Sequence, residues 1–147
     1  MNQPCLVPVP WRNLWCVNED FEVQVRGHKI VVPEFFLIDG ASVPMALWPV
    51  CYHPFDTRVI AAALVHDWLY WSHQVDKYEA DLIFLDLLLQ NGADKMKAYA
   101  MYQAVAIFGE NYWPLSADDV QLLRLLHISV KDSLRFHEYH FPVEALA

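Results

Sequence analysis

The chain lacks the long apolar runs and the repeats that mark several large protein classes. A membrane-spanning helix needs roughly 20 consecutive apolar residues, and the longest apolar runs here are only Val59–Val65 and Leu82–Leu89, the second interrupted by Asp86. No internal repeat and no low-complexity stretch occurs. We therefore expect a protein with no transmembrane segment.

Basic residues are also scarce, because 10 Lys and Arg stand against 18 Asp and Glu and give a net charge of −8. This balance argues against a protein that holds nucleic acid or anionic lipid by bulk charge. Charged residues make up only 19% of the chain, below the roughly 25% of a typical soluble domain, while apolar residues reach 56%. The chain can bury a core, which excludes disorder.

Cysteine is the third scarcity, with three residues at wide spacing and no CxxC pair: Cys5, Cys16 and Cys51. This predicts reduced thiols in a cytoplasmic protein, and neither a disulfide framework nor a zinc site. The N-terminus has no basic segment followed by an apolar one, so we expect no signal peptide.

A chain of 147 residues and 17.1 kDa predicts a single domain, residues 1–147. Residues 1–20 are proline-rich and read as an irregular or edge segment. The alternation in Phe21–Val25, the turn residues 26–29 and the β-rich run from Ile30 predict a hairpin. Residues 37–45 contain Asp39-Gly40 and Pro44 and read as a loop.

Helical periodicity begins after this loop. Residues 57–72 contain neither Pro nor Gly and place apolar residues at helical spacing. Asp76 and Glu79 form a capping box that predicts the start of a second helix, and Gly92 predicts its end. A third helix is predicted over about 94–108. Ser116 predicts the start of a fourth helix within a C-terminal segment, 114–147. The predicted class is α+β, with a small N-terminal β-hairpin packed on three to four α-helices around a central antiparallel helical hairpin.

The residues with the clearest chemical potential lie in the first predicted helix. His66 and Tyr70 are four residues apart and share a face, and Asp67 lies about 100° round the helix from His66. In an antiparallel helix pair, residues equidistant from the turn lie level with each other. Asp81 is therefore expected to face His66 or Asp67, with His66 the better partner for a buried carboxylate.

A histidine held by a carboxylate on one ring nitrogen presents the other nitrogen to water as a base. An adjacent aspartate can bind a hard cation such as calcium, but calcium takes six to eight oxygen ligands. A loop must therefore supply further oxygens, and residues 39–42, from Asp39 to Ser42, are the candidate. The competing interpretation is an inert His–Asp–Tyr network that ties two helices together.

Residues 21–113 resemble the phage and prophage family catalogued as domain of unknown function 1353. The resemblance rests on motifs in the order and spacing of that family: Val32-Pro33, Ile38-Asp39-Gly40-Ala41-Ser42-Val43-Pro44, Trp48, Ala62-Ala63-Leu64-Val65-His66-Asp67-Trp68-Leu69-Tyr70, Ala80-Asp81-Leu82-Ile83-Phe84 and Phe108-Gly109. Ile38 and Gly40 depart from the family's usual Thr and apolar residue. The resemblance implies a phage setting, in the cytoplasm of the bacterial host or in the phage particle, and it implies no activity.

A more distant resemblance, over about twenty residues, is to the His-Asp helix of phospholipase A-two, whose signature is H-D-x-C-Y with a later Asp on an antiparallel helix. It implies that His66 activates water, Asp67 binds calcium, and Tyr70 and Asp81 orient the histidine. Leu69 stands where that family has Cys, and the glycine-rich calcium loop and the disulfides are absent from the sequence.

Two classes of function remain open from the sequence. The first is a phage-encoded hydrolase-like protein, a metal-assisted esterase or lipase acting on a lipid or ester substrate. The second is a non-catalytic phage protein, either a virion component or a factor that binds a host protein. Catalytic candidates are His66, Asp67, Tyr70 and Asp81, metal candidates are Asp67 and Asp39, and Ser42 is a further polar candidate in the loop.

Overall fold

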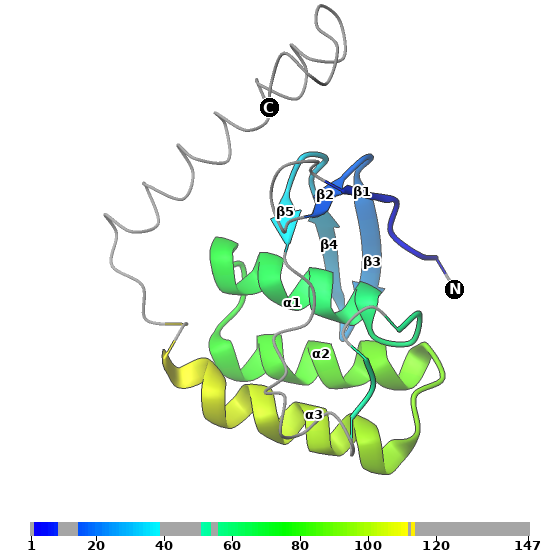
Figure 1. Cartoon of the computed structure of the whole chain (residues 1–147). Coiled ribbons are helices and arrows are strands. Elements are labelled where there is room, and N and C mark those ends of the chain that lie inside the picture. Colours follow the sequence, from blue (N-terminus) through cyan, green and yellow to red (C-terminus); the bar gives the residue numbers. More distant parts are fainter. Residues whose placement is uncertain (1, 9–14, 39–50, 54–55, 112, 114–147) are drawn as a thin grey trace, which may run out of the picture.

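Five short strands precede three α-helices in the computed structural model, which describes residues 2–8, 15–38, 51–53, 56–111 and 113 (Figure 1). The strands form two separate antiparallel sheets, one of three strands and one of two. The helices lie side by side, with α1 and α3 both packed on α2. The α+β class predicted from the sequence is confirmed.

The three-stranded sheet has the order β1–β2–β5 and joins segments that are distant in the sequence. It consists of β1 (Leu6–Pro8), β2 (Trp15–Val17) and β5 (Leu37–Ile38). Trp15 pairs with Ile38, and Val7 pairs with Cys16. The sequence predicts an irregular or edge segment for residues 1–20, and β1 is an edge strand of this sheet while β2 is its central strand. The prediction of a loop from residue 37 was wrong at β5. Pairing with distant strands orders these residues, which lack a strand pattern of their own.

The two-stranded sheet is the expected hairpin, formed by β3 (Phe21–Val25) and β4 (His28–Val32). Arg26 and Gly27 make a two-residue turn in which both have positive φ, 52° and 78°. Two consecutive positive φ values are typical of a type I′ turn, whose twist matches that of paired strands. His28 and Lys29 therefore belong to β4, although the sequence pattern places them in the turn.

The helices are α1 (Ile60–Ser72), α2 (Lys77–Gln90) and α3 (Lys95–Phe108), followed by the 3₁₀ turn η2 (Gly109–Asn111). The side chain of Asp76 accepts a hydrogen bond from the Glu79 N–H, and that of Asp94 accepts one from the Lys97 N–H. These N-caps stand where the sequence places them. α1 starts three residues later than predicted, because residues 57–59 form a turn, and the predicted fourth helix lies outside the described residues.

The hydrophobic core lies between the β3–β4 hairpin and the first two helices. α1 contacts β4, and α2 contacts β3. The largest fully buried side chains come from the hairpin and the first two helices and also from β2, the turn before α1 and α3: Val17, Ile30, Val32, Val59, Leu64, Val65, Leu69, Ile83, Leu87, Leu88 and Met101. The buried residues on the sides of α1 and α2 that face the hairpin therefore fix how each helix is rotated about its own axis.

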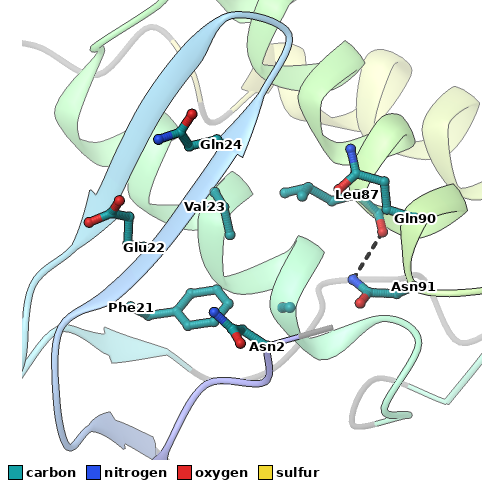
Figure 2. A pocket seen from close by; sticks show the side chains of 9 residues that line it. Asn2, Phe21, Glu22, Val23, Gln24, Leu87, Gln90 and Asn91 are labelled. Carbon is teal, nitrogen blue, oxygen red and sulfur yellow. Dashed lines mark hydrogen bonds between the residues drawn. The ribbon is translucent and has the colours of Figure 1, made fainter.

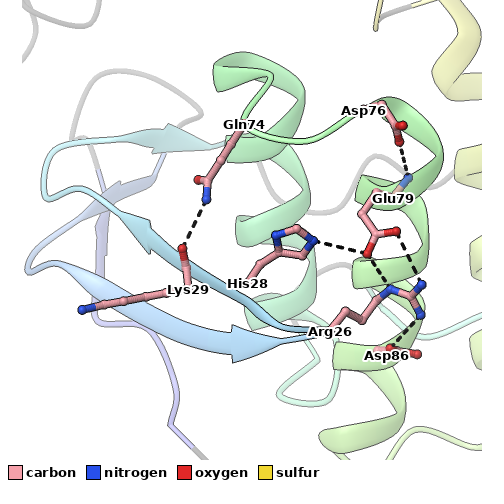
Figure 3. A network of polar contacts seen from close by, with 7 residues as sticks. All are labelled: Arg26, His28, Lys29, Gln74, Asp76, Glu79 and Asp86. Atoms are coloured by element: carbon pink, nitrogen blue, oxygen red, sulfur yellow. Dashed lines mark hydrogen bonds and ion pairs between the residues drawn. The ribbon is translucent and has the colours of Figure 1, made fainter.

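A polar network fastens the hairpin turn to α2 (Figure 3). Arg26 Nε donates to Glu79 Oε1 at 2.7 Å, and Arg26 Nη1 lies 3.4 Å from Asp86 Oδ2. His28 Nε2 lies 3.5 Å from Glu79 Oε1, and Gln74 Nε2 donates to the carbonyl oxygen of Lys29 at 3.2 Å. Asp86, which interrupts the apolar run of α2, therefore faces this turn and not the core.

All three cysteines are free thiols, as the sequence predicts. Cys5 is exposed, whereas Cys16 and Cys51 are buried. Burial, and secondarily the charge of Glu34, raise the pKa of the Cys16 thiol to about 11. Within the described part of the chain, no helix has the length and apolar character needed to cross a membrane.

Candidate functional site

Helix α1 carries two of the candidate residues on one face. His66 and Tyr70 lie one turn apart, and their ring centroids are 4.2 Å from each other. The helix ends at His73, whose φ of 53° is left-handed and whose N–H donates to the Leu69 carbonyl. This C-cap turns the chain back, so that α2 runs antiparallel to α1 and passes the His66 face.

Helix α2 supplies the carboxylate. Lys77 is its first residue and Asp81 follows one turn later, so both side chains lie on the same face. Asp81 is buried, with 3% of its side chain exposed, and the His66 side chain is 9% exposed. The sequence favours His66 over Asp67 as the partner of Asp81, and in the structure Asp81 contacts His66.

The Asp81 carboxylate accepts three hydrogen bonds. His66 Nε2 lies 2.8 Å from Oδ1, the Tyr70 hydroxyl donates to the same oxygen at 2.7 Å, and Lys77 Nζ donates to Oδ2 at 2.8 Å. We call these four residues the His–Asp–Tyr–Lys network. Each contact is within ordinary hydrogen-bond distance, so the buried carboxylate has a donor on both oxygens.

The protonation states follow from burial and from these contacts. Burial raises the pKa of the Asp81 carboxyl, but hydrogen bonds from His66, Lys77 and Tyr70 outweigh it and hold the pKa below its usual value. Burial lowers the pKa of the His66 imidazole more strongly than its contact with Asp81 raises it. Asp81 is therefore ionised and His66 neutral at neutral pH.

These states define the tautomer of His66. An ionised carboxylate can only accept hydrogen bonds, so the Nε2 atom that contacts Asp81 carries the proton. A neutral imidazole has one protonated nitrogen, which leaves a lone pair on Nδ1. Tyr70 stays protonated, because burial and its hydrogen bond to Asp81 raise the pKa of its hydroxyl.

Residues at the C-terminal end of α3 and just after it also contact the network. Lys77 Nζ also donates to the carbonyl oxygen of Ala106 at 3.0 Å, and it lies 3.7 Å from Glu110 Oε1. Gly109 packs so closely on Tyr70 that a Cβ atom there would collide with the hydroxyl. Trp113 contacts the Tyr70 ring edge-on with centroids 5.0 Å apart. The network thus joins all three helices.

Of the remaining candidates, the structure describes only Asp67. Asp67 is half-buried on the adjacent flank of α1, and its charge contributes to the raised pKa of Tyr70. Asp39 and Ser42 lie outside the described residues. Among the described residues, no group of three or more His, Cys, Asp and Glu side chains converges as a metal site would. Asp67 alone supplies too few oxygens for calcium, so the described residues do not by themselves fit that ion.

Sequence reasoning missed Lys77 and Gly109 as parts of the site. The signal for Lys77 was present in its spacing of four residues from Asp81, which is the spacing of helical ion pairs. Gly109 was identified only as a helix terminator. Its contact with Tyr70 depends on how α3 lies against α1, which local sequence does not encode.

The fold and the site define an α+β protein whose helical hairpin encloses a buried His–Asp–Tyr–Lys network. The chain belongs to the family described as "Protein of unknown function (DUF1353)", whose model matches residues 15–105. The matched range includes all four network residues, and the membership in this family that the sequence motifs indicate is confirmed.

Two curated relatives come from Sinorhizobium fredii (strain NBRC 101917 / NGR234). "Uncharacterized protein y4jT" is 31% identical over 114 residues, which cover 77% of this chain and 34% of the relative. "Uncharacterized protein y4iH" is 36% identical over 74 residues, which cover 50% of this chain and 31% of the relative. The chain thus matches about a third of the length of each relative. No solved structure matches the chain significantly.

Proposed function

We propose that this protein is a hydrolase-like protein of phage or prophage origin in which His66 is a general base. The observation that carries the proposal is the contact between His66 Nε2 and Asp81 Oδ1 at 2.8 Å, in surroundings that keep the imidazole neutral. A neutral, oriented imidazole is the form that accepts a proton from water. The phage setting is supported by the resemblance of the sequence motifs to phage and prophage proteins.

The proposed step is ester hydrolysis. His66 Nδ1 takes a proton from a water molecule as the water oxygen attacks the carbonyl carbon of the ester. The tetrahedral intermediate then collapses, the bond to the alkoxide breaks, and the alkoxide leaves with the proton returned by His66. Asp81 stabilises the imidazolium that forms between these two events, and Tyr70 and Lys77 keep the carboxylate in position.

The proposed substrate is a lipid or another ester, and calcium bound by Asp67 and Asp39 is the proposed cofactor. Asp67 directly follows His66 and can supply one carboxylate ligand. The remaining oxygens must come from elsewhere. Proton transfer at His66 requires no step that passes through the metal, because the imidazole and the Asp81 carboxylate together supply the base.

The test is hydrolysis of p-nitrophenyl esters and of phosphatidylcholine micelles, with and without calcium. We expect His66→Ala to lower kcat at least 100-fold, which lies within the usual contribution of a general base, while the matched variant His28→Ala keeps the wild-type rate. Because burial lowers the pKa of His66, the rise of kcat/KM with pH should have its midpoint below the ordinary histidine pKa of 6.5. Absence of hydrolysis, or an unchanged rate in a folded His66→Ala variant, would refute the proposal and assign the network to a structural role in a virion component or host-binding factor.

A further inference from the structure

The hairpin leaves one strand edge open next to a pocket. In a hairpin with a two-residue turn, the residues that flank the turn, Val25 and His28, form a hydrogen-bonded pair, and such pairs then alternate along the strands. Phe21, Val23 and Val25 therefore bond to β4. Consequently, the backbone N–H and C=O groups of Glu22 and Gln24 point away from β4.

The other strand supports this assignment. Lys29 lies opposite Gln24 and accepts a hydrogen bond on its outer side from Gln74 Nε2. No backbone partner on the outer side of Glu22 or Gln24 is present in the described part of the chain. An edge of this kind presents the donors and acceptors that an added strand requires.

A cavity of about 160 Å³ adjoins this edge (Figure 2). Its apolar wall consists of Phe21, Val23, Ala61 and Leu87, and the end of α2 contributes Gln90 and Asn91 opposite the strand. A cavity of this size accommodates one side chain, and its apolar wall suits the methylene stem of a long one.

The polar part of the cavity favours a ligand that donates hydrogen bonds. Asn91 Nδ2 donates to the Leu87 carbonyl at 2.9 Å, while Asn91 Oδ1 is buried without a hydrogen-bond partner among the described residues. This oxygen lies behind the cavity wall, so a donor in the cavity reaches it only when the Asn91 side chain shifts toward the cavity, and that contact removes the cost of a buried acceptor without a partner. The described residues that line the cavity include no base and one acid, Glu22, whose Oε2 lies 3.5 Å from Lys29 Nζ. The whole chain carries −8, which favours a basic ligand over an acidic one.

From these features we infer a second binding site, in which the open edge of β3 takes an extended peptide segment with a lysine or arginine side chain. The peptide backbone pairs with Glu22 and Gln24, the basic side chain enters the cavity along Phe21 and Leu87, and its N–H groups approach Asn91 Oδ1. A second copy of the chain fits less well, because it carries the same net charge of −8.

The test is binding of a labelled hexapeptide, fluorescein-Val-Thr-Lys-Val-Thr-Val-amide, measured by fluorescence anisotropy with the full chain. Alternate N-methylation of the peptide removes the donors that face the strand, and norleucine in place of lysine removes only the charged head. We expect the first change to weaken affinity at least tenfold and the second several-fold.

Gln24→Pro is the substitution in the protein that corresponds to N-methylation of the peptide. It deletes an N–H group that points away from β4 and leaves the hydrogen bonds to β4 intact, and edge positions tolerate proline. Gln24→Thr keeps the N–H and serves as the control. We expect at least a tenfold loss with Gln24→Pro and less than twofold with Gln24→Thr, both with wild-type melting behaviour. Equal binding of the N-methylated peptide, an unchanged affinity of Gln24→Pro, or a dimer that Gln24→Pro dissolves would each overturn the inference, the last by assigning the edge to a second copy.

Discussion

Replacement of Lys77 by methionine tests how the network contributes to stability. The side chains are similar in length, so the change removes the ammonium group and leaves the apolar stem. Asp81 then keeps two neutral donors, His66 and Tyr70, but loses its cationic partner at 2.8 Å. Its side chain is only 3% exposed, so the charge remains away from water.

Breaking a buried ion pair from one side typically costs about 3–5 kcal/mol of unfolding free energy. Lys77 is 14% exposed and also donates to the Ala106 carbonyl, so we expect Lys77→Met to fall in this range. A loss of that size is a large share of the roughly 5–15 kcal/mol that stabilises a typical domain. The double variant Lys77→Met, Asp81→Leu should lose less than the sum of the two single changes, because it removes both charges together.

The assay is urea unfolding followed by tryptophan fluorescence, since the chain contains six tryptophans. The control is Lys29→Met, which removes an exposed partner 3.5 Å from Glu22. Exposed pairs contribute about 0–1 kcal/mol. If Lys77→Met costs no more than Lys29→Met, the argument that Asp81 needs this cation is refuted.

The surroundings of the network give three more predictions. Gly109→Ala should destabilise the protein by about 1–3 kcal/mol, because the added Cβ collides with the Tyr70 hydroxyl, and an unchanged melting temperature would contradict this packing. The stability of the wild type should fall more steeply than that of His66→Gln as the pH drops below 6.5, the ordinary histidine pKa. The unfolded histidine binds a proton there more readily than the buried one, which gives a difference of up to about 1.4 kcal/mol per pH unit in urea titrations. Calcium at about 100 times its dissociation constant should raise the unfolding free energy by roughly 2.7 kcal/mol, which a thermal melt detects as a higher melting temperature. Asp67→Asn should abolish this shift. If calcium causes no shift in the wild type, calcium has no part in the proposed mechanism.

Local sequence was sufficient for the helices because the signals that start and stop them act over a few residues. Asp76 and Asp94 accept hydrogen bonds from backbone N–H groups in the first turns of α2 and α3. These hydrogen bonds involve only residues close together in the sequence, so they form without help from the rest of the fold. The hairpin was also predictable from alternation and from Gly27. The three-stranded sheet was not, because β5 has two residues and is ordered by pairing with β2, which lies much earlier in the chain.

The sequence by itself determined that a histidine and an aspartate meet across the helical hairpin. Both lie about equally far from a short turn, and this spacing sets their level in an antiparallel pair. The sequence favoured His66 over Asp67 as the partner of Asp81, and the tertiary structure brings the two side chains into contact, since burial of Leu64, Val65 and Leu69 sets the rotation of α1.

The tertiary structure likewise decided the protonation states of the network. Burial removes water from His66 and lowers its pKa, while three donors brought from two helices keep Asp81 ionised. Neither effect is a property of a residue or of its neighbours in the chain. Desolvation exists only once α1, α2 and α3 have packed together, and this packing turns a His-Asp pattern into a neutral, oriented imidazole.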